Sequence, residues 1–276
     1  MGEARIQVDG VGKRYGELSA LSRLSLAVGR GEVFGLLGPN GAGKTTTLRI
    51  LTGMLAPSRG SARIDGLDCF ERRVELTRRV GYLPDSPVFY DYLSGWELIR
   101  FAGNMRGFER AEVDDRANAL FARLHLTGAA DEYVANYSLG MKKKMGLALA
   151  LLHDPGVLIL DEPTTGLDPA AMREVRALIE RSRDEGKTVL LSTHLLDLAE
   201  RVCDRVAIID RGCLRCEGAP AELRARVLPF ERGAARGSLE DVFVAMTSPD
   251  PSWTTIDRKE AESFSKASER AATSPR

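Results

Sequence analysis

A glycine-rich stretch early in the chain, "GLLGPNGAGKTTTLRI" over residues 35–50, has the composition that phosphate binding requires. Closely spaced glycines let the backbone turn with several amides pointing inward, where they can bind phosphate. The lysine that follows supplies a cation for the β- and γ-phosphates, and the next threonine can ligate Mg²⁺. The pattern GxxxxGK[ST] thus predicts a nucleoside-triphosphate loop made of Gly38, Pro39, Asn40, Gly41, Ala42, Gly43, Lys44, Thr45 (the metal ligand) and Thr46.

Two acidic residues and a histidine follow apolar segments later in the chain. Asp161 and Glu162 come directly after "VLIL", a run that predicts a central strand buried on both faces. Because open α/β sheets bind ligands beyond the carboxyl ends of their strands, Asp161 is placed to hold Mg²⁺ through water and Glu162 to polarise an attacking water. The segment "TVLLST" brings His194 to the same edge, where a donor would contact the γ-phosphate oxygens.

The segments that must position these side chains are short apolar strands separated by helical stretches. This alternation predicts the α/β fold class, with a mainly parallel sheet covered by helices. The expected strands are residues 4–10, 21–28, 32–38, 61–66, 80–84, 156–162, 187–193 and 205–212. The strand pattern disappears between residues 80 and 156, which predicts a helical insert over about residues 86–154.

Two helices of this insert have readable signals. Ser94 and Glu97 fit a capping box, ahead of an apolar face made of Leu98, Phe101, Ala102 and Met105. The helix after Tyr137 has a second apolar face, which we expect in the core, made of Met141, Met145, Ala148, Leu149 and Leu152.

The composition indicates neither a strong overall electrostatic field nor a membrane-spanning segment. Its 276 residues suffice for one large α/β domain or two small ones, and 39 Lys and Arg balance 39 Asp and Glu. No global positive field therefore draws it to nucleic acid or acidic lipid, and we expect no nucleic-acid partner. The start lacks the apolar segment of a secretory signal, and residues 145–152 fall far below the ~18 apolar residues of a membrane span. We expect a soluble, cytoplasmic chain.

Cysteines and the end of the chain suggest no further site. Cys213 and Cys216 have metal-ligand spacing, but they lack a second pair or a nearby His. Alternate positions of a short strand explain them better than zinc. After Met246 the sequence is polar and rich in Ser and Thr, which predicts a disordered tail over residues 247–276 and a folded domain over residues 1–246.

The motifs together resemble those of ATP-binding cassette (ABC) ATPases, in the same order, from about Ala4 to Gly218. They are "KRYG", the phosphate loop, "GYLPDSP", "YSLGMKKK", "LILDEPTTGLDP" and "LSTHLL". The resemblance implies a P-loop NTPase of ABC type that uses ATP and Mg²⁺, with an antiparallel β subdomain beside the sheet and a helical subdomain inserted in it. It implies that Tyr15 stacks on adenine. Asp168, an N-cap candidate before Pro169, would also lie at a dimer interface.

The segment "YSLGMKKKM" resembles the family's signature sequence, with Ser138 and Gly140 retained and Leu139 in place of the first glycine. In the family this serine and the helix N-terminus close on the γ-phosphate of ATP held by a second cassette, so the resemblance implies a dimer, most simply a homodimer. Three lysines at a helix N-terminus need a negative partner, because the helix dipole disfavours cations there. The partner's ATP would supply it, and the lysines would divide between that phosphate and solvent.

Asp85 departs from the family pattern. The family usually has Gln after the "GYLP"-like strand, as a sensor of Mg²⁺ and the γ-phosphate, and Asp is shorter and anionic. Asp85 is a candidate metal ligand whose direct contact with Mg²⁺ stays open. Leu139 stiffens the signature loop, so we expect weakened or retuned dimer closure and retained ATPase activity.

The ATPase is expected to drive transport. The chain has one cassette and no sustained heptads, unlike most family members in translation and repair. "YDYLSGWELIRFAGNMRG" and "GSLEDVFVAMT" look like segments of bacterial exporter ATPases. The resemblance implies that the chain is held at the inner face of the cell membrane by a separate transmembrane permease. The aromatic residues Phe89, Tyr90, Tyr92 and Trp96 would line a groove for a cytoplasmic helix of that permease, and core packing is the alternative for about half of them. The alternatives are a nucleic-acid or ribosome-linked ABC ATPase and an ATP-switch regulatory protein.

Overall fold

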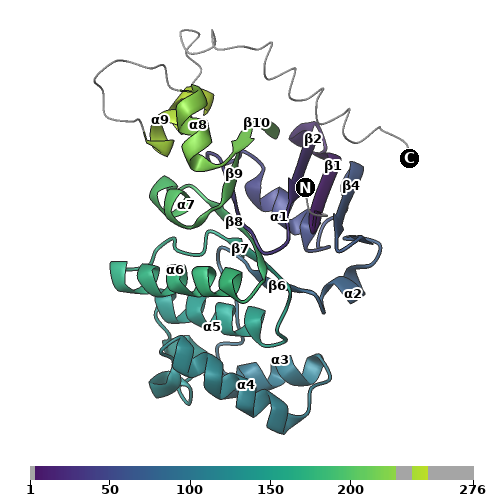
Figure 1. Cartoon of the computed structure of the whole chain (residues 1–276). Helices are drawn as coiled ribbons and strands as arrows, with labels where there is room; N and C mark the ends of the chain where they lie inside the picture. The colour runs from purple at the N-terminus through teal and green to yellow at the C-terminus, as the bar shows by residue number, and fades with distance from the viewer. Residues whose placement is uncertain (1–3, 228–237, 248–276) are drawn as a thin grey trace.

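The computed structural model describes residues 4–227 and 238–247, whose strands form two sheets (Figure 1). The antiparallel sheet has the order β2-β1-β4-β5 and contains β1 (Ile6–Tyr15), β2 (Leu18–Val28), β4 (Arg59–Ile64) and β5 (Leu67–Asp68). The second sheet has the order β10-β9-β3-β8-β7-β6 and contains β3 (Val33–Leu37), β6 (Val80–Leu83), β7 (Val157–Asp161), β8 (Thr188–Thr193), β9 (Arg205–Asp210) and β10 (Cys213–Gly218). Its neighbouring strands are parallel except β10 and β9. The predicted fold class is confirmed.

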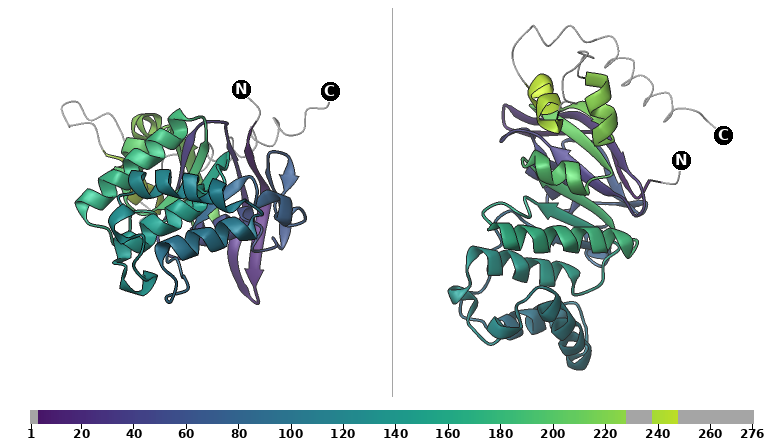
Figure 2. Two further views of the ribbon diagram at one scale, coloured as in Figure 1. Left: turned by 90° about the horizontal axis from the view of Figure 1, so that it is seen from below. Right: turned by 60° about the vertical axis from the view of Figure 1, so that its left-hand side comes forward.

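Helices accompany the second sheet and extend beyond its β6 edge. Figure 1 and the right-hand view of Figure 2 show α3 and α4 at the end of the molecule farthest from the antiparallel sheet. The helices are α1 (Lys44–Leu51), α2 (Arg73–Leu76), α3 (Gly95–Met105), α4 (Arg110–Arg123), α5 (Leu139–Leu151), α6 (Pro169–Asp184), α7 (Leu196–Val202), α8 (Pro220–Val227) and α9 (Leu239–Thr247), with short 3₁₀ turns at Thr127–Ala129 and Val134–Asn136. The named elements between β6 and β7 are thus α3, α4, α5 and the two 3₁₀ turns, whereas α2 precedes β6.

The interior strand β7, which lies between β8 and the edge strand β6, separates two hydrophobic clusters. Leu158 and Leu160 pack in the cluster that contains the helices of the insert, whereas Val157 and Ile159 pack in the cluster formed with the antiparallel sheet. This alternation is the period-two geometry of a strand buried on both faces. The predicted burial of this strand is confirmed, and Asp161, its last residue, lies at the carboxyl end of the parallel strands.

Strand β1 continues past the predicted end at Gly10. Gly10 has a φ of 56°, and the register with β2 shifts between Val8 and Val11. A β-bulge absorbs an extra residue while pairing resumes beyond it, so a glycine that resembles a turn lies inside the strand. The extension carries the strand to Tyr15.

Helix α5 lies very close to β6 because two glycines face the contact. A Cβ added to Gly81 of β6 would lie 2.2 Å from the carbonyl oxygen of Ala150, and one added to Gly146 would lie 2.5 Å from Leu83 Cδ1. The predicted core face of this helix is also confirmed, since Met145, Ala148 and Leu152 are buried, and Met141 and Leu149 pack against the same cluster.

Replacing Gly81 with Ala is therefore expected to lower the free energy of unfolding by about 1–3 kcal/mol, because the new methyl group overlaps backbone of α5. Urea denaturation followed by circular dichroism measures this change. Gly128→Ala is the matched control, since no heavy atom lies within 4 Å of its added Cβ. Equal stability of the two variants would contradict the close packing.

Helix α3 presents its apolar residues differently from a core helix. Its capping box is confirmed, since Ser94 Oγ accepts from the Glu97 amide at 3.2 Å and Glu97 Oε2 accepts from the Ser94 amide at 2.8 Å. Leu98 is buried, but Phe101 and Met105 are exposed.

No helix within residues 4–227 or 238–247 combines the length and apolar character of a membrane span. Thr247 ends α9, and the predicted tail otherwise lies outside the described residues.

Candidate functional site

The glycine-rich loop is held tightly between two strands and the start of α1. A Cβ on Gly38 would lie 2.4 Å from the carbonyl oxygen of Ile209, and one on Gly43 would lie 2.9 Å from that of Ala20. Gly43 also has a φ of 107° and forms the N-cap of α1, which begins at Lys44. Larger residues would not fit at either glycine, and the loop leads directly into a helix N-terminus, where backbone amides and the helix dipole favour an anion.

The Lys44 ammonium lies between this loop and the end of β7. Its Nζ donates to the carbonyl oxygens of Gly38, at 2.6 Å, and Pro39, at 3.2 Å, and lies 3.8 Å from Glu162 Oε1. Burial lowers the pKa of Lys44, while the nearby carboxylates of Glu162 and Asp161 partly offset this effect. The structure therefore brings Lys44 of the glycine-rich loop close to Glu162 at the end of β7, as the sequence pattern predicts.

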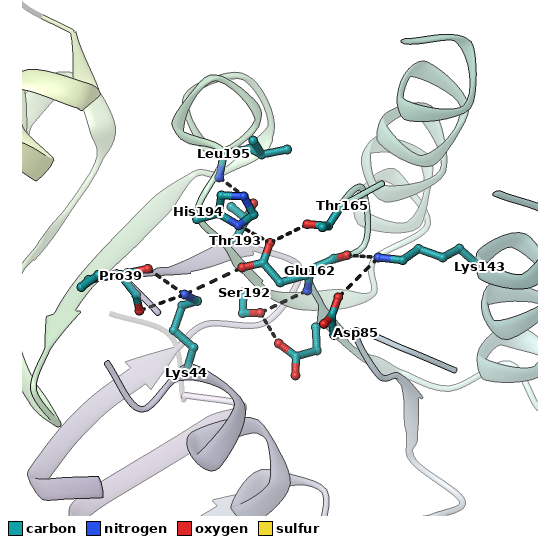
Figure 3. A network of polar contacts seen from close by, with 12 residues as sticks. Pro39, Lys44, Asp85, Lys143, Glu162, Thr165, Ser192, Thr193, His194 and Leu195 are labelled. Carbon is teal, nitrogen blue, oxygen red and sulfur yellow. Dashed lines mark hydrogen bonds and ion pairs between the residues drawn. The ribbon is translucent and has the colours of Figure 1, made fainter. Parts of the chain in front are cut away.

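Glu162 is the centre of the polar network in Figure 3. Its amide donates to the carbonyl oxygen of Ser192 at 3.1 Å and to Ser192 Oγ at 3.2 Å. Its Oε2 accepts from Thr165 Oγ1 at 3.0 Å and lies 2.9 Å from His194 Nδ1, a hydrogen-bond distance for a ring N–H donating to a carboxylate. Lys44, Glu162 and His194 thus converge on one point at the carboxyl end of the sheet.

Asp161 is buried beside Glu162 at the end of β7. Parallel pairing sets Asp161 opposite Ser192 of β8, and Ser192 Oγ donates to Asp161 Oδ1 at 2.5 Å. Ser192 therefore orients both acidic residues, a role that the sequence analysis missed although the strand register could have indicated it. Thr45, half-buried in the first turn of α1, supplies the loop's hydroxyl.

The lysine run at the start of α5 does not lack negative partners, contrary to the sequence-based interpretation. Each of its three ammonium groups faces an acidic residue of the same chain. The partners are Asp91 for Lys142, at 3.8 Å, Asp85 for Lys143, at 3.7 Å, and Glu174 for Lys144. The anions are supplied by neighbouring loops and by α6, so the partner's ATP is not needed to explain this run.

Lys143 is almost completely buried, with 1% of its surface exposed. Besides facing Asp85, its Nζ donates to the backbone carbonyl oxygen of Glu162. Burial lowers the pKa of Lys143, and the carboxylates of Asp85 and Glu162 act in the opposite direction. The sequence carried a signal for this burial, because Leu147 and Ala150 follow at helical spacing and form a second apolar side of α5.

Other predicted binding residues lie outside this network among the residues that the structure describes. Tyr15 ends β1 with its ring partly exposed and Lys13 Nζ 5.4 Å from the ring centre. Ser138 N-caps α5 by accepting from the Met141 amide at 3.2 Å, and Gly140 lies in the first turn. Asp168 is the N-cap of α6, and its Oδ1 accepts hydrogen bonds from the amides of Ala170, at 2.8 Å, and Ala171, at 2.9 Å. These bonds lower the pKa of Asp168.

A groove of about 500 Å³ runs between α3, α5 and the loop after β6. It is lined by Thr77, Tyr82, Pro84, Pro87, Val88, Phe89, Tyr90, Leu98, Phe101, Ala102, Met105, Arg106, Gly146 and Leu149. Phe89 and Tyr90 of the predicted aromatic set line it, whereas Trp96 packs against Phe121 with ring centres 5.0 Å apart. The groove is mainly apolar and adjoins Asp85.

Comparisons with known proteins converge on one family. The family model described as "ABC transporter" matches residues 21–165. The Nod factor export ATP-binding protein I of Paraburkholderia xenovorans is 43% identical over 226 residues, which are 82% of this chain and 74% of that protein. A solved ATP-binding subunit of an ABC transporter is 32% identical, with a TM-score of 0.79, and covers 87% of this chain and 98% of its own. A dimeric bacterial ABC transporter cassette is 25% identical, with a TM-score of 0.72, over 78% of this chain and 98% of its own.

Proposed function

The chain belongs to the ABC transporter family as an ATP-binding ATPase subunit, and from this premise we propose that it hydrolyses ATP as a dimer to drive a separate membrane permease, as an exporter. The observation that carries the proposal is the convergence of Lys44, Glu162 and His194 at the end of the central sheet. A phosphate-binding cation, a carboxylate and an imidazole within hydrogen-bond reach are the parts that water attack on a γ-phosphate needs.

Glu162 is the proposed general base. Thr165 and His194 hold its Oε2, and Lys44 lies nearer to Oε1, so the carboxylate has a fixed orientation towards the loop that would hold the γ-phosphate. A positioned base contributes about 10²–10⁴-fold to a rate. His194 is proposed to contact the γ-phosphate and to keep Glu162 aligned with the attacking water.

The residues present fit Mg²⁺ bound with ATP. Mg²⁺ prefers oxygen ligands and usually keeps several waters, and this site offers the Thr45 hydroxyl and the buried Asp161 carboxylate. Thr45 would ligate the metal directly and Asp161 through water, with Ser192 holding Asp161 in place. The metal would neutralise charge on the β- and γ-phosphates. The protein's own part is to align the phosphates along the loop and to orient the water with Glu162.

Dimerisation is proposed because the signature residues Ser138 and Gly140 are accessible to a second copy. Ser138 is exposed at the N-terminus of α5, and Gly140 has room beside it, since an added Cβ would meet nothing nearer than 3.7 Å. A helix N-terminus with a serine hydroxyl is suited to a phosphate that a second copy brings. The similar dimeric bacterial cassette supports this arrangement, in which Tyr15 would stack on adenine and Asp168 would lie at the interface.

The groove beside α3 is the proposed docking site for a permease helix. Its exposed apolar residues, Val88, Tyr90, Phe101 and Met105, offer the surface that helix-in-groove recognition uses. The export function of the similar Nod factor protein supports an exporter. The nucleic-acid alternative loses its main sequence support, because the lysine run pairs with acidic residues of the chain itself.

A pull-down from native membranes, with tagged Glu162→Gln protein, ATP and Mg²⁺, tests the proposed partner. A multi-span membrane protein is expected to co-purify, and Met105→Glu should reduce its recovery about tenfold, the effect of about 1.4 kcal/mol. Met54→Glu is the matched control, because Met54 is 64% exposed, like Met105 at 74%, but lies outside the groove. Recovery of ribosomes or nucleic acid instead, or equal loss in both variants, would contradict the proposal.

A further inference from the structure

The buried lysine of α5 touches the peptide of the proposed catalytic base. We propose that Lys143 is a positioning residue that fixes the backbone of Glu162 and connects it, through Asp85, to the loop that lines the groove. This inference rests on the proposed function of Glu162 as the base. It assigns to Lys143 a role in turnover that is separate from binding ATP.

The backbone of Glu162 needs such a restraint. Its φ of 47° is in the left-handed region, which is unfavourable for a residue with a side chain and persists only where neighbouring groups hold it. Ser192 holds the amide side, through two hydrogen bonds. On the carbonyl side, the Thr165 amide donates at 3.3 Å, and Lys143 is the side-chain donor that the described part of the chain provides.

The reach of Lys143 depends on how closely α5 approaches β6. Gly146 lets the helix contact Leu83, and Lys143 lies one turn earlier on α5, facing the end of β7. Burying an ammonium group is costly unless it is paired and hydrogen-bonded. Lys143 satisfies this condition with the Asp85 carboxylate and the Glu162 carbonyl oxygen, so its charge is directed at these two groups.

Asp85 extends the connection to the surface. Its carboxylate is half exposed and faces Lys143 in Figure 3, while its chain neighbours Pro84 and Pro87 line the groove. A helix that enters the groove and moves this loop would move the anion that holds Lys143. Asp85 is anionic at the position where the family usually has Gln, and the ammonium group of Lys143 balances this negative charge.

Replacing Lys143 with Met removes the ammonium while keeping a long apolar chain in the buried position. We expect kcat for ATP hydrolysis to fall about 10- to 100-fold, the cost of a slightly misplaced reacting group. The KM for ATP should change less than about twofold, because Lys143 does not contact the phosphate loop. Lys143→Arg, which keeps the charge and donors, should recover most of the rate, and Lys142→Met, which faces Asp91 instead, should match the wild type.

Wild-type turnover by Lys143→Met, or a loss through KM with kcat unchanged, would overturn the positioning role. The double variant Asp85→Asn/Lys143→Met should be no slower than Lys143→Met alone, because the two changes remove one interaction. Additive losses would overturn the link through Asp85. If Lys143→Met does not fold, the variant Asp85→Asn provides the test, since the half-exposed site of Asp85 tolerates the change. A severalfold lower kcat is then expected, and an unchanged kcat refutes the proposal.

A wild-type protein without turnover would instead refute the proposed function.

Discussion

Replacing Glu162 with Gln lowers kcat for ATP hydrolysis by about 10²–10⁴-fold, the contribution of a positioned general base. The amide keeps the shape of the side chain and can still accept from Thr165, and the backbone bonds to Ser192 and Lys143 do not depend on the carboxylate. Nucleotide binding should therefore persist, and an ATP-bound dimer should accumulate because its hydrolysis is blocked.

Phosphate release and size-exclusion chromatography with ATP and Mg²⁺ measure these two effects. Glu132→Gln is the control, since Glu132 is exposed and is not a partner in the hydrogen bonds described for Glu162. If the Glu162 variant hydrolyses ATP at the wild-type rate, the side chain is not the base, although the phosphate loop would still bind nucleotide.

Replacing Lys44 with Ala is expected to weaken ATP binding at least about 100-fold. Removing a buried charge partner of an anion costs about 2–5 kcal/mol, and each 1.4 kcal/mol is a factor of ten in affinity. The substitution should lower the affinity for ATP itself, because the Lys44 ammonium lies between the Gly38 carbonyl oxygen of the glycine-rich loop and the carboxylate of Glu162.

Titration with a fluorescent ATP analogue measures the affinity directly. Lys187→Ala is the matched control, since its ammonium pairs with Asp154 and lies outside the loop. Unchanged affinity in the Lys44 variant would show that the glycine-rich loop does not bind the phosphates. Comparable weakening in the control would show that loss of any lysine charge suffices.

The sheet and the centre of the site could be predicted because each depended on local pattern and parallel topology. The apolar run before Asp161 indicated a strand buried on both faces, and the structure divides its residues between two clusters. Once strands with Asp161, Glu162 and His194 at their ends were placed in one parallel sheet, their convergence followed from geometry.

Residues defined by tertiary packing were harder to predict. Lys143 belongs to a charge run, which usually indicates a solvated face, yet α5 is covered on most sides and buries it. Phe101 and Met105 have the spacing of a core face, but they line a groove because no element of the described chain covers them. Periodicity shows which residues share a helix face, and only the packed structure shows what that face contacts.

The most direct test of the central claim is phosphate release from ATP by the purified wild-type protein, measured over a range of protein concentrations with Mg²⁺. A site completed by a second copy predicts a rate that rises more steeply than linearly with protein concentration and that disappears in Lys44→Ala. Release no greater than that of Lys44→Ala at every concentration would contradict the claim that this cassette is an ATP-hydrolysing motor.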